Sequence, residues 1–99
     1  ESIGIGAFTL KNGGNYNVAL GGRALENNSN HHNVALGYRA LQLSTWGDDN
    51  IAIGYQVADN LTTGDHNLII GNNIDIPIAA GDDQLNIANI IYGITIDGS

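Results

Sequence analysis

The chain has 99 residues with ten acidic and three basic side chains, a formal net charge of −7, and no cysteine. This balance argues against binding to nucleic acid or to an anionic membrane surface, because both need clustered lysine and arginine. Without cysteine there is no disulfide framework, thiolate metal site or cysteine nucleophile. No apolar run approaches the roughly 20 residues of a membrane-spanning helix, so we expect no membrane insertion.

The composition favours short strands joined by many turns. The chain has 14 glycines, frequent asparagine and one proline, and glycine and asparagine are the residues that best tolerate positive φ in turns. Isoleucine, leucine and valine make up about a quarter of the residues, too many for a disordered segment. The chain also begins within its own sequence pattern. We therefore interpret residues 1–99 as a single repeat domain and expect it to be a fragment of a longer fibrous protein.

A five-residue motif recurs along the chain, with an aliphatic residue at its second and fourth positions. Its copies are Ser2–Gly6, Asn17–Gly21, Asn33–Gly37, Asn50–Gly54, Asn67–Gly71 and the divergent Gln84–Ala88. The offset grows from 15 to 16 to 17 residues and then stays at 17, which defines repeats of about 2–16, 17–32, 33–49, 50–66, 67–83 and 84–93. A nearly constant period of this length indicates a solenoid.

Alternation with period two predicts that each motif is a strand with two different faces. We expect the aliphatic face to form the core, through Val18, Leu20, Val34, Leu36, Ile51, Ile53, Leu68 and Ile70. The opposite face carries small residues, which let another backbone approach closely. Ala19, Ala35 and Ala52 are therefore candidates for the interface of a symmetric trimer, the alternative being tight packing within one chain.

A second apolar register follows each motif and predicts a second short strand in every rung. It comprises Thr9-Leu10, Ala24-Leu25, Ala40-Leu41, Val57-Ala58, Ile74-Asp75 and Ile91-Tyr92. Gly-Asp turns recur at 17 residues just before the next motif. The predicted fold is all-β, a parallel β-solenoid (a left-handed β-roll or a trimeric β-helix) of about six rungs of 15–17 residues.

The repeats resemble a known family. Residues 33–41 read Asn-Val-Ala-Leu-Gly-Tyr-Arg-Ala-Leu, and residues 50–56 read Asn-Ile-Ala-Ile-Gly-Tyr-Gln. They resemble the head repeats of trimeric autotransporter adhesins, and even more the related repeats of bacteriophage tail-fibre and tailspike proteins. The resemblance implies a left-handed parallel β-roll, with three chains side by side and the aliphatic pair of each motif inside.

The end of the chain resembles another part of these fibres. Residues 85–93 are similar to a tail-fibre segment that often precedes a self-cleaving C-terminal chaperone. The rungs are longer than the adhesin head repeat. The last copy has Asn86 and Ala88 where the others have a small or apolar residue and glycine, so we expect the roll to end or change form there.

Residues able to carry chemistry are few. Asp48, Asp65 and Asp82 should stack in the turns, where carboxylates either stay solvated as turn formers or recruit a cation such as Ca²⁺. His31, His32 and His66 also fall in turns, where we expect solvated residues rather than a shared site on a trimer axis. We find no nucleophile elbow or paired-carboxylate spacing. The sequence therefore predicts no resident cofactor and no enzymatic activity.

Four side chains are candidates for binding at the surface. Trp46 lies in a turn outside the repeated strand positions, where its ring could stack on a sugar or pack against a neighbouring chain. Tyr38 and Tyr55 are 17 residues apart and should stack, beside Arg39. Such ladders on a solenoid first stabilise the stack.

Together, these patterns and the resemblance predict a structural and adhesive segment of a homotrimeric fibre. We expect a phage tail fibre or tailspike that attaches to a host-cell glycan or protein receptor, located on the virion. The alternative is the head of a bacterial trimeric adhesin on the extracellular cell surface. A carbohydrate-active β-helix enzyme would need acids that converge in a cleft, whereas here the acids follow the turns.

Overall fold

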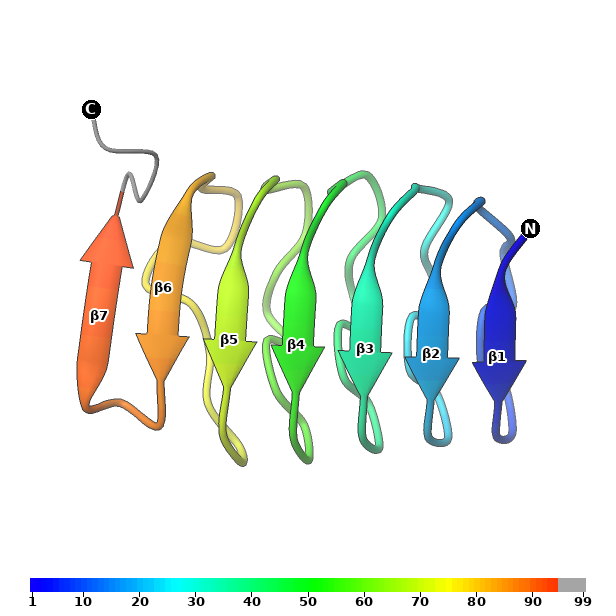
Figure 1. The fold of residues 1–99 in the computed structure, drawn as a ribbon, viewed down its shortest axis with the longest axis horizontal. Helices are drawn as coiled ribbons and strands as arrows, with labels where there is room; N and C mark the ends of the chain where they lie inside the picture. The colour runs from blue at the N-terminus through cyan, green and yellow to red at the C-terminus, as the bar shows by residue number, and fades with distance from the viewer. Residues whose placement is uncertain (95–99) are drawn as a thin grey trace.

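The fold is one sheet whose strands follow each other in chain order (Figure 1). The computed structural model describes residues 1–94, with side chains to residue 90. The strands are β1 (Ile3–Ile5), β2 (Val18–Leu20), β3 (Val34–Leu36), β4 (Ile51–Ile53), β5 (Leu68–Ile70), β6 (Gln84–Ile87) and β7 (Ile91–Ile94). β1 to β6 are parallel, one strand to a rung, and β7 is antiparallel to β6. The predicted parallel β-solenoid is confirmed.

The strand register pairs the residues that the repeat places in equivalent positions. Val18 lies beside Val34, and Val34 lies beside Ile51. Alanine likewise stacks on alanine through β2, β3 and β4. The motif alignment is therefore the alignment of the rungs in space.

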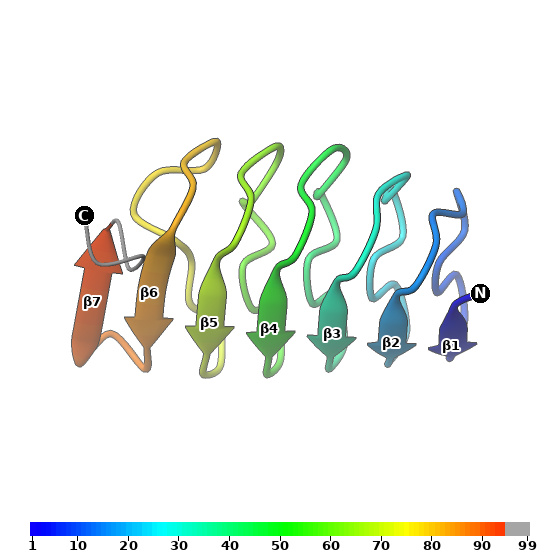
Figure 2. The same ribbon diagram turned by 45° about the horizontal axis from the view of Figure 1, so that its top comes forward.

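The predicted second strand of each rung is wrong. Behind the sheet the chain returns as a series of turns (Figure 2), which we call the return segments. Leu25, Leu41 and Ala58 have φ of 50°, 52° and 50°, a left-handed conformation that interrupts an extended strand. The exception is Ile91-Tyr92, which lies in β7 and pairs antiparallel with β6.

The core lies between the sheet and the return segments, and it is made by the face that was expected to lie outside. Ala19, Ala35 and Ala52 are at most 1% exposed and pack in one cluster with Leu25 and Leu41. The predicted interface on these alanines is therefore wrong. The predicted core is wrong as well, because none of its residues is buried: Val18, Leu20, Val34, Leu36, Ile51, Ile53, Leu68 and Ile70.

A column of asparagine side chains explains this orientation. Asn33 Oδ1 accepts the N–H of Asn50 at 2.8 Å, and Asn33 Nδ2 donates to the carbonyl of Gly47 at 2.9 Å. Asn17, Asn50 and Asn67 make the same two bonds, to the rung that follows and to the turn before it. These amides reach both partners only from inside the coil. The residue two positions on then also points inward, and the aliphatic pair points outward.

Glycine at the fifth motif position lets neighbouring rungs approach closely. Gly21, Gly37 and Gly54 have φ of 130°, 128° and 139°. A β-carbon on Gly21 would lie 2.6 Å from the carbonyl carbon of Gly37, closer than real atoms come. Both the conformation and the spacing therefore require glycine.

The repeat ends where this glycine is replaced. Ala88 and Asn89 both have positive φ, and the Ile90 N–H donates to the Ile87 carbonyl at 2.9 Å. This turn reverses the chain into β7, which covers the last parallel edge. The prediction that the roll ends or changes form at the last copy is confirmed.

Replacing Asn50 with alanine should destabilise the solenoid strongly. The change leaves the Asn67 N–H and the Gly64 carbonyl without their side-chain partner in the interior, and each orphaned buried group costs about 1–3 kcal/mol. We expect the free energy of unfolding, measured by urea denaturation, to fall by about 2–4 kcal/mol.

Asn72 offers a matched control. Its Oδ1 also accepts a backbone N–H of a neighbouring rung, from Tyr55 at 3.0 Å, but at an exposed position where water can replace it. Asn72→Ala should cost less than about 1 kcal/mol. Equal losses in the two variants would contradict a dominant role for the interior column.

Candidate functional site

The outer side of the sheet is a continuous apolar surface, which we call the aliphatic face. Each of β1 to β6 contributes two side chains that stack on those of the next strand. The face comprises Ile3, Ile5, Val18, Leu20, Val34, Leu36, Ile51, Ile53, Leu68, Ile70, Leu85 and Ile87. Exposed fractions reach 62% at Ile3 and are still 37% at Ile53. Contiguous apolar patches of this kind mark interaction surfaces.

Two corners flank the aliphatic face. Corner 1 follows each strand and comprises residues 21–23, 37–39, 54–56 and 71–73. Corner 2 precedes each strand and comprises residues 14–16, 30–32, 47–49, 64–66 and 81–83. Their polar residues are therefore held at the two borders of the aliphatic face by the same repeat that builds the sheet.

The aspartates proposed as metal ligands stack along corner 2 as predicted, but they bind the backbone. The carboxylate of Asp48 accepts the N–H of His31, that of Asp65 the N–H of Asp48, and that of Asp82 the N–H of Asp65, each at 2.8 Å. Within the part of the chain that the structure describes, no group of three or more His, Cys, Asp or Glu residues could hold a metal ion. These carboxylates link successive turns.

A second polar column runs along the outside of corner 2, and sequence reasoning missed it. Tyr16 stacks on His32 with ring centroids 5.4 Å apart, and His32 Nδ1 lies 3.5 Å from Asp49. His66 lies between two carboxylates, 3.6 Å from Asp49 and 3.5 Å from Asp83. The 17-residue spacing of the last three was the available signal. The histidines face carboxylates of neighbouring rungs, and His31 instead accepts the N–H of Asn15 through Nδ1 at 3.1 Å.

Corner 1 holds the predicted tyrosine stack. The rings of Tyr38 and Tyr55 are 5.7 Å apart and 17° from parallel, so this prediction is confirmed. The Arg39 guanidinium lies 5.8 Å from the centre of the Tyr38 ring. Because the two rings cover each other, they present their edges outward and first serve the stacking of rungs.

Trp46 belongs to a short insertion in the third rung. One residue, Ser29, separates Asn28 from Asn30 in the second rung, whereas Thr45 and Trp46 occupy the same place in the third. This insertion accounts for the increase in offset from 16 to 17. The Trp46 side chain is 70% exposed, and its role in binding a receptor stays a prediction.

The one resolved electrostatic perturbation among the described residues lies on the return segments. Partial burial raises the pKa of Asp59, and the charge of Asp75 and a hydrogen bond to its carboxyl raise that pKa further. The charge of Arg39 acts in the opposite direction. Two carboxyl groups that share a proton can resemble a general acid–base pair, but this pair lies outside any detected cavity.

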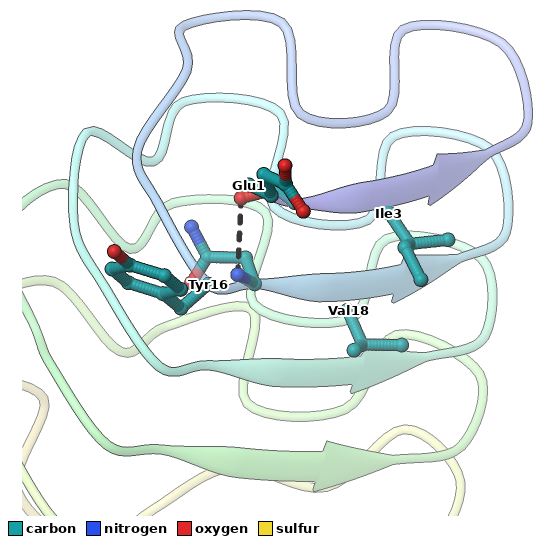
Figure 3. A pocket seen from close by; sticks show the side chains of 6 residues that line it. Glu1, Ile3, Tyr16 and Val18 are labelled. Carbon is teal, nitrogen blue, oxygen red and sulfur yellow. Dashed lines mark hydrogen bonds between the residues drawn. The ribbon is translucent and has the colours of Figure 1, made fainter.

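A hollow of about 470 Å³ lies at the first rung (Figure 3). Its lining is Glu1, Ser2, Ile3, Tyr16, Asn17 and Val18. Ser2 Oγ accepts the N–H of Asn17 at 3.0 Å and so begins the column that asparagine continues. With a single carboxylate and no histidine, lysine or cysteine, this lining offers no acid–base pair or nucleophile.

Neither the family models, the curated proteins nor the solved structures with which the chain was compared match it. The residues described contain no helix long and apolar enough to cross a membrane.

Replacing Asp59 with asparagine should stabilise the protein at neutral pH. The pKa of Asp59 is higher in the fold than in the unfolded chain, so the fold favours its protonated form. That contribution is complete below the unfolded pKa and is lost as the pH rises through the folded pKa. At pH 7 the ionised pair therefore costs stability, which Asp59→Asn removes.

We expect the variant to gain up to about 1 kcal/mol of unfolding free energy at pH 7 and to gain little or nothing near pH 3.5. Thermal melts at both pH values measure the difference. Asp75→Asn, which removes the other carboxyl group of the pair, should also gain at pH 7. A loss of stability that is equal at both pH values would contradict the assignment.

Proposed function

We propose that this chain is a structural and adhesive segment of a homotrimeric fibre, with the aliphatic faces of three copies packed around a common axis. The observation that carries the proposal is the aliphatic face itself. No charged residue lies in β1 to β6, although the chain carries a net charge of −7. The apolar surface is therefore kept apart from the charges, which lie in corners and return segments.

Copies of the same chain are the partner that fits this face. Its side chains repeat at the spacing of parallel strands, about 4.8 Å, over six rungs. A second copy presents the same spacing, so every layer of one ladder meets an equivalent layer of the other. Burying the exposed part of twelve aliphatic side chains yields on the order of 10 kcal/mol per chain, comparable to the cost of association.

The threefold state and the biological setting come from the resemblance of residues 33–41 and 50–56 to tail-fibre and adhesin head repeats. We propose a phage tail fibre or tailspike on the virion, acting in host attachment. The second candidate is the head of a bacterial surface adhesin, which the same aliphatic face supports. In both settings the role is assembly and adhesion rather than catalysis.

Replacing Ile53 with lysine should break the assembly and leave the single chain folded, because Ile53 is exposed and its charge stays in water. Light scattering should give a mass near three times the 10.4 kDa of one chain for the wild type, and a mass near that of one chain for the variant. Circular dichroism should show β structure in both.

Ile78→Lys is the matched control, since Ile78 is 52% exposed but lies on a return segment, away from the aliphatic face. This variant should keep the wild-type mass. A monomeric wild type, or an Ile53→Lys variant that still assembles, would refute the proposal.

The adhesive part of the proposal assigns the receptor contact to Trp46. Its ring is the most exposed of the described aromatic side chains, and such rings stack on the apolar faces of sugars. On a glycan array, Trp46→Ala should lose the binding shown by the wild type, and Trp46→Phe should retain most of it. Melting temperature and mass should not change. Binding that survives in Trp46→Ala would place the receptor contact elsewhere.

A further inference from the structure

The two corners that flank the aliphatic face differ in chemistry, and we infer that they meet between neighbouring copies, corner 1 of one copy against corner 2 of the next. This inference rests on the proposed homotrimer. It identifies the polar contacts that set the order and direction of the chains around the axis.

Corner 1 presents a column of hydrogen-bond donors. Arg23, Arg39, Gln56 and Asn73 occupy equivalent positions in successive rungs, all with φ between 48° and 62°. Arg23 lies 3.9 Å from Glu26 of its own chain. Within residues 1–94 the Arg39 guanidinium makes no ion pair and its Nε is buried without a hydrogen-bond partner. This donor column thus retains unused hydrogen-bonding capacity.

Corner 2 presents acceptors and negative charge. Five of the ten acidic residues of the chain lie in it, with no lysine or arginine: Asp48, Asp49, Asp65, Asp82 and Asp83. Its outer column, which includes Asp49, has the same left-handed backbone as the donor column of corner 1. Asp49 contacts its own chain only through His32 and His66, at 3.5 and 3.6 Å, and is itself exposed.

The geometry of a cyclic assembly brings these columns together. When identical faces surround an axis parallel to the solenoid, the residue after a strand lies beside the residue before the equivalent strand of the next copy. Gln56 then lies at the level of Asp49 of the neighbouring copy. Arg39 is one rung away, about 4.8 Å along the axis, within reach of that carboxylate.

Antiparallel solenoids related by a twofold axis would give a different contact. Corner 2 would then border corner 2, and one seam would collect the carboxylates of both copies while the other collected their arginines. Like charges placed opposite each other cost affinity and suppress wrong arrangements. The distribution of charge between the corners therefore selects parallel chains that contact each other head to tail around the axis.

Cysteine cross-linking tests this arrangement directly, because the chain has no cysteine of its own. In the double variant Asp49→Cys/Gln56→Cys, the two cysteines of one chain lie at opposite ends of β4. That distance is on the order of 15–20 Å, too far for a disulfide within the chain, which needs Cα atoms within about 7 Å. Oxidation should therefore give covalent trimers on a non-reducing gel.

Each single cysteine variant serves as the control and should remain monomeric on that gel. Dimers formed by Asp49→Cys alone would show that corner 2 meets corner 2, and would overturn the inference. A wild type that is trimeric by light scattering, with no cross-linked species in the double variant, would overturn it too and leave the proposed function standing. A monomeric wild type would refute both.

Charge exchange gives an independent readout. Arg39→Glu should raise the concentration at which half of the trimer dissociates about tenfold at low salt, and adding Asp49→Arg to it should restore most of the affinity. Lys11→Glu makes the same change of charge outside both corners and should have a smaller effect. Equal effects of Arg39→Glu and Lys11→Glu would contradict a contact at Arg39.

Discussion

The interior column of asparagine side chains is the interaction on which the rest of this structure depends. Each amide accepts a backbone N–H from the next rung and donates to a carbonyl in the following turn, so it joins strand, turn and neighbouring rung at one point. Because both partners lie inside the coil, the amide must be inside as well. The inner face of the sheet is then filled by asparagine and alanine, and little room remains for larger groups.

This arrangement divides the apolar residues between two surfaces. The return segments supply most of the large side chains of the core, such as Leu25, Leu41 and Leu61, while the sheet turns its larger side chains outward. A single chain thus has a narrow core and a broad apolar exterior. Stability and assembly become linked in such a molecule, because anything that binds only the folded state stabilises it by mass action.

The corners do a different task from the sheet. Their left-handed residues reverse the chain within two or three positions and hold one polar side chain per rung at each border of the aliphatic face. In corner 2 these side chains bind to neighbouring rungs, as Asp65 and His66 do. At the far end the antiparallel β7 covers the last parallel strand, which ends the growth of the stack. The solenoid therefore has a polarity along its axis as well as an apolar side.

Much of this architecture is legible in the sequence alone. The motif copies gave the number of rungs and their register, and the equal spacing of Tyr38 and Tyr55 or of Asp48 and Asp65 predicted that they stack. Period-two alternation also showed which residues share a face, but not which face is inside, because the pattern is the same for both. Only the tertiary structure decided that, since the asparagine column and the close return segments leave room for alanine and none for isoleucine.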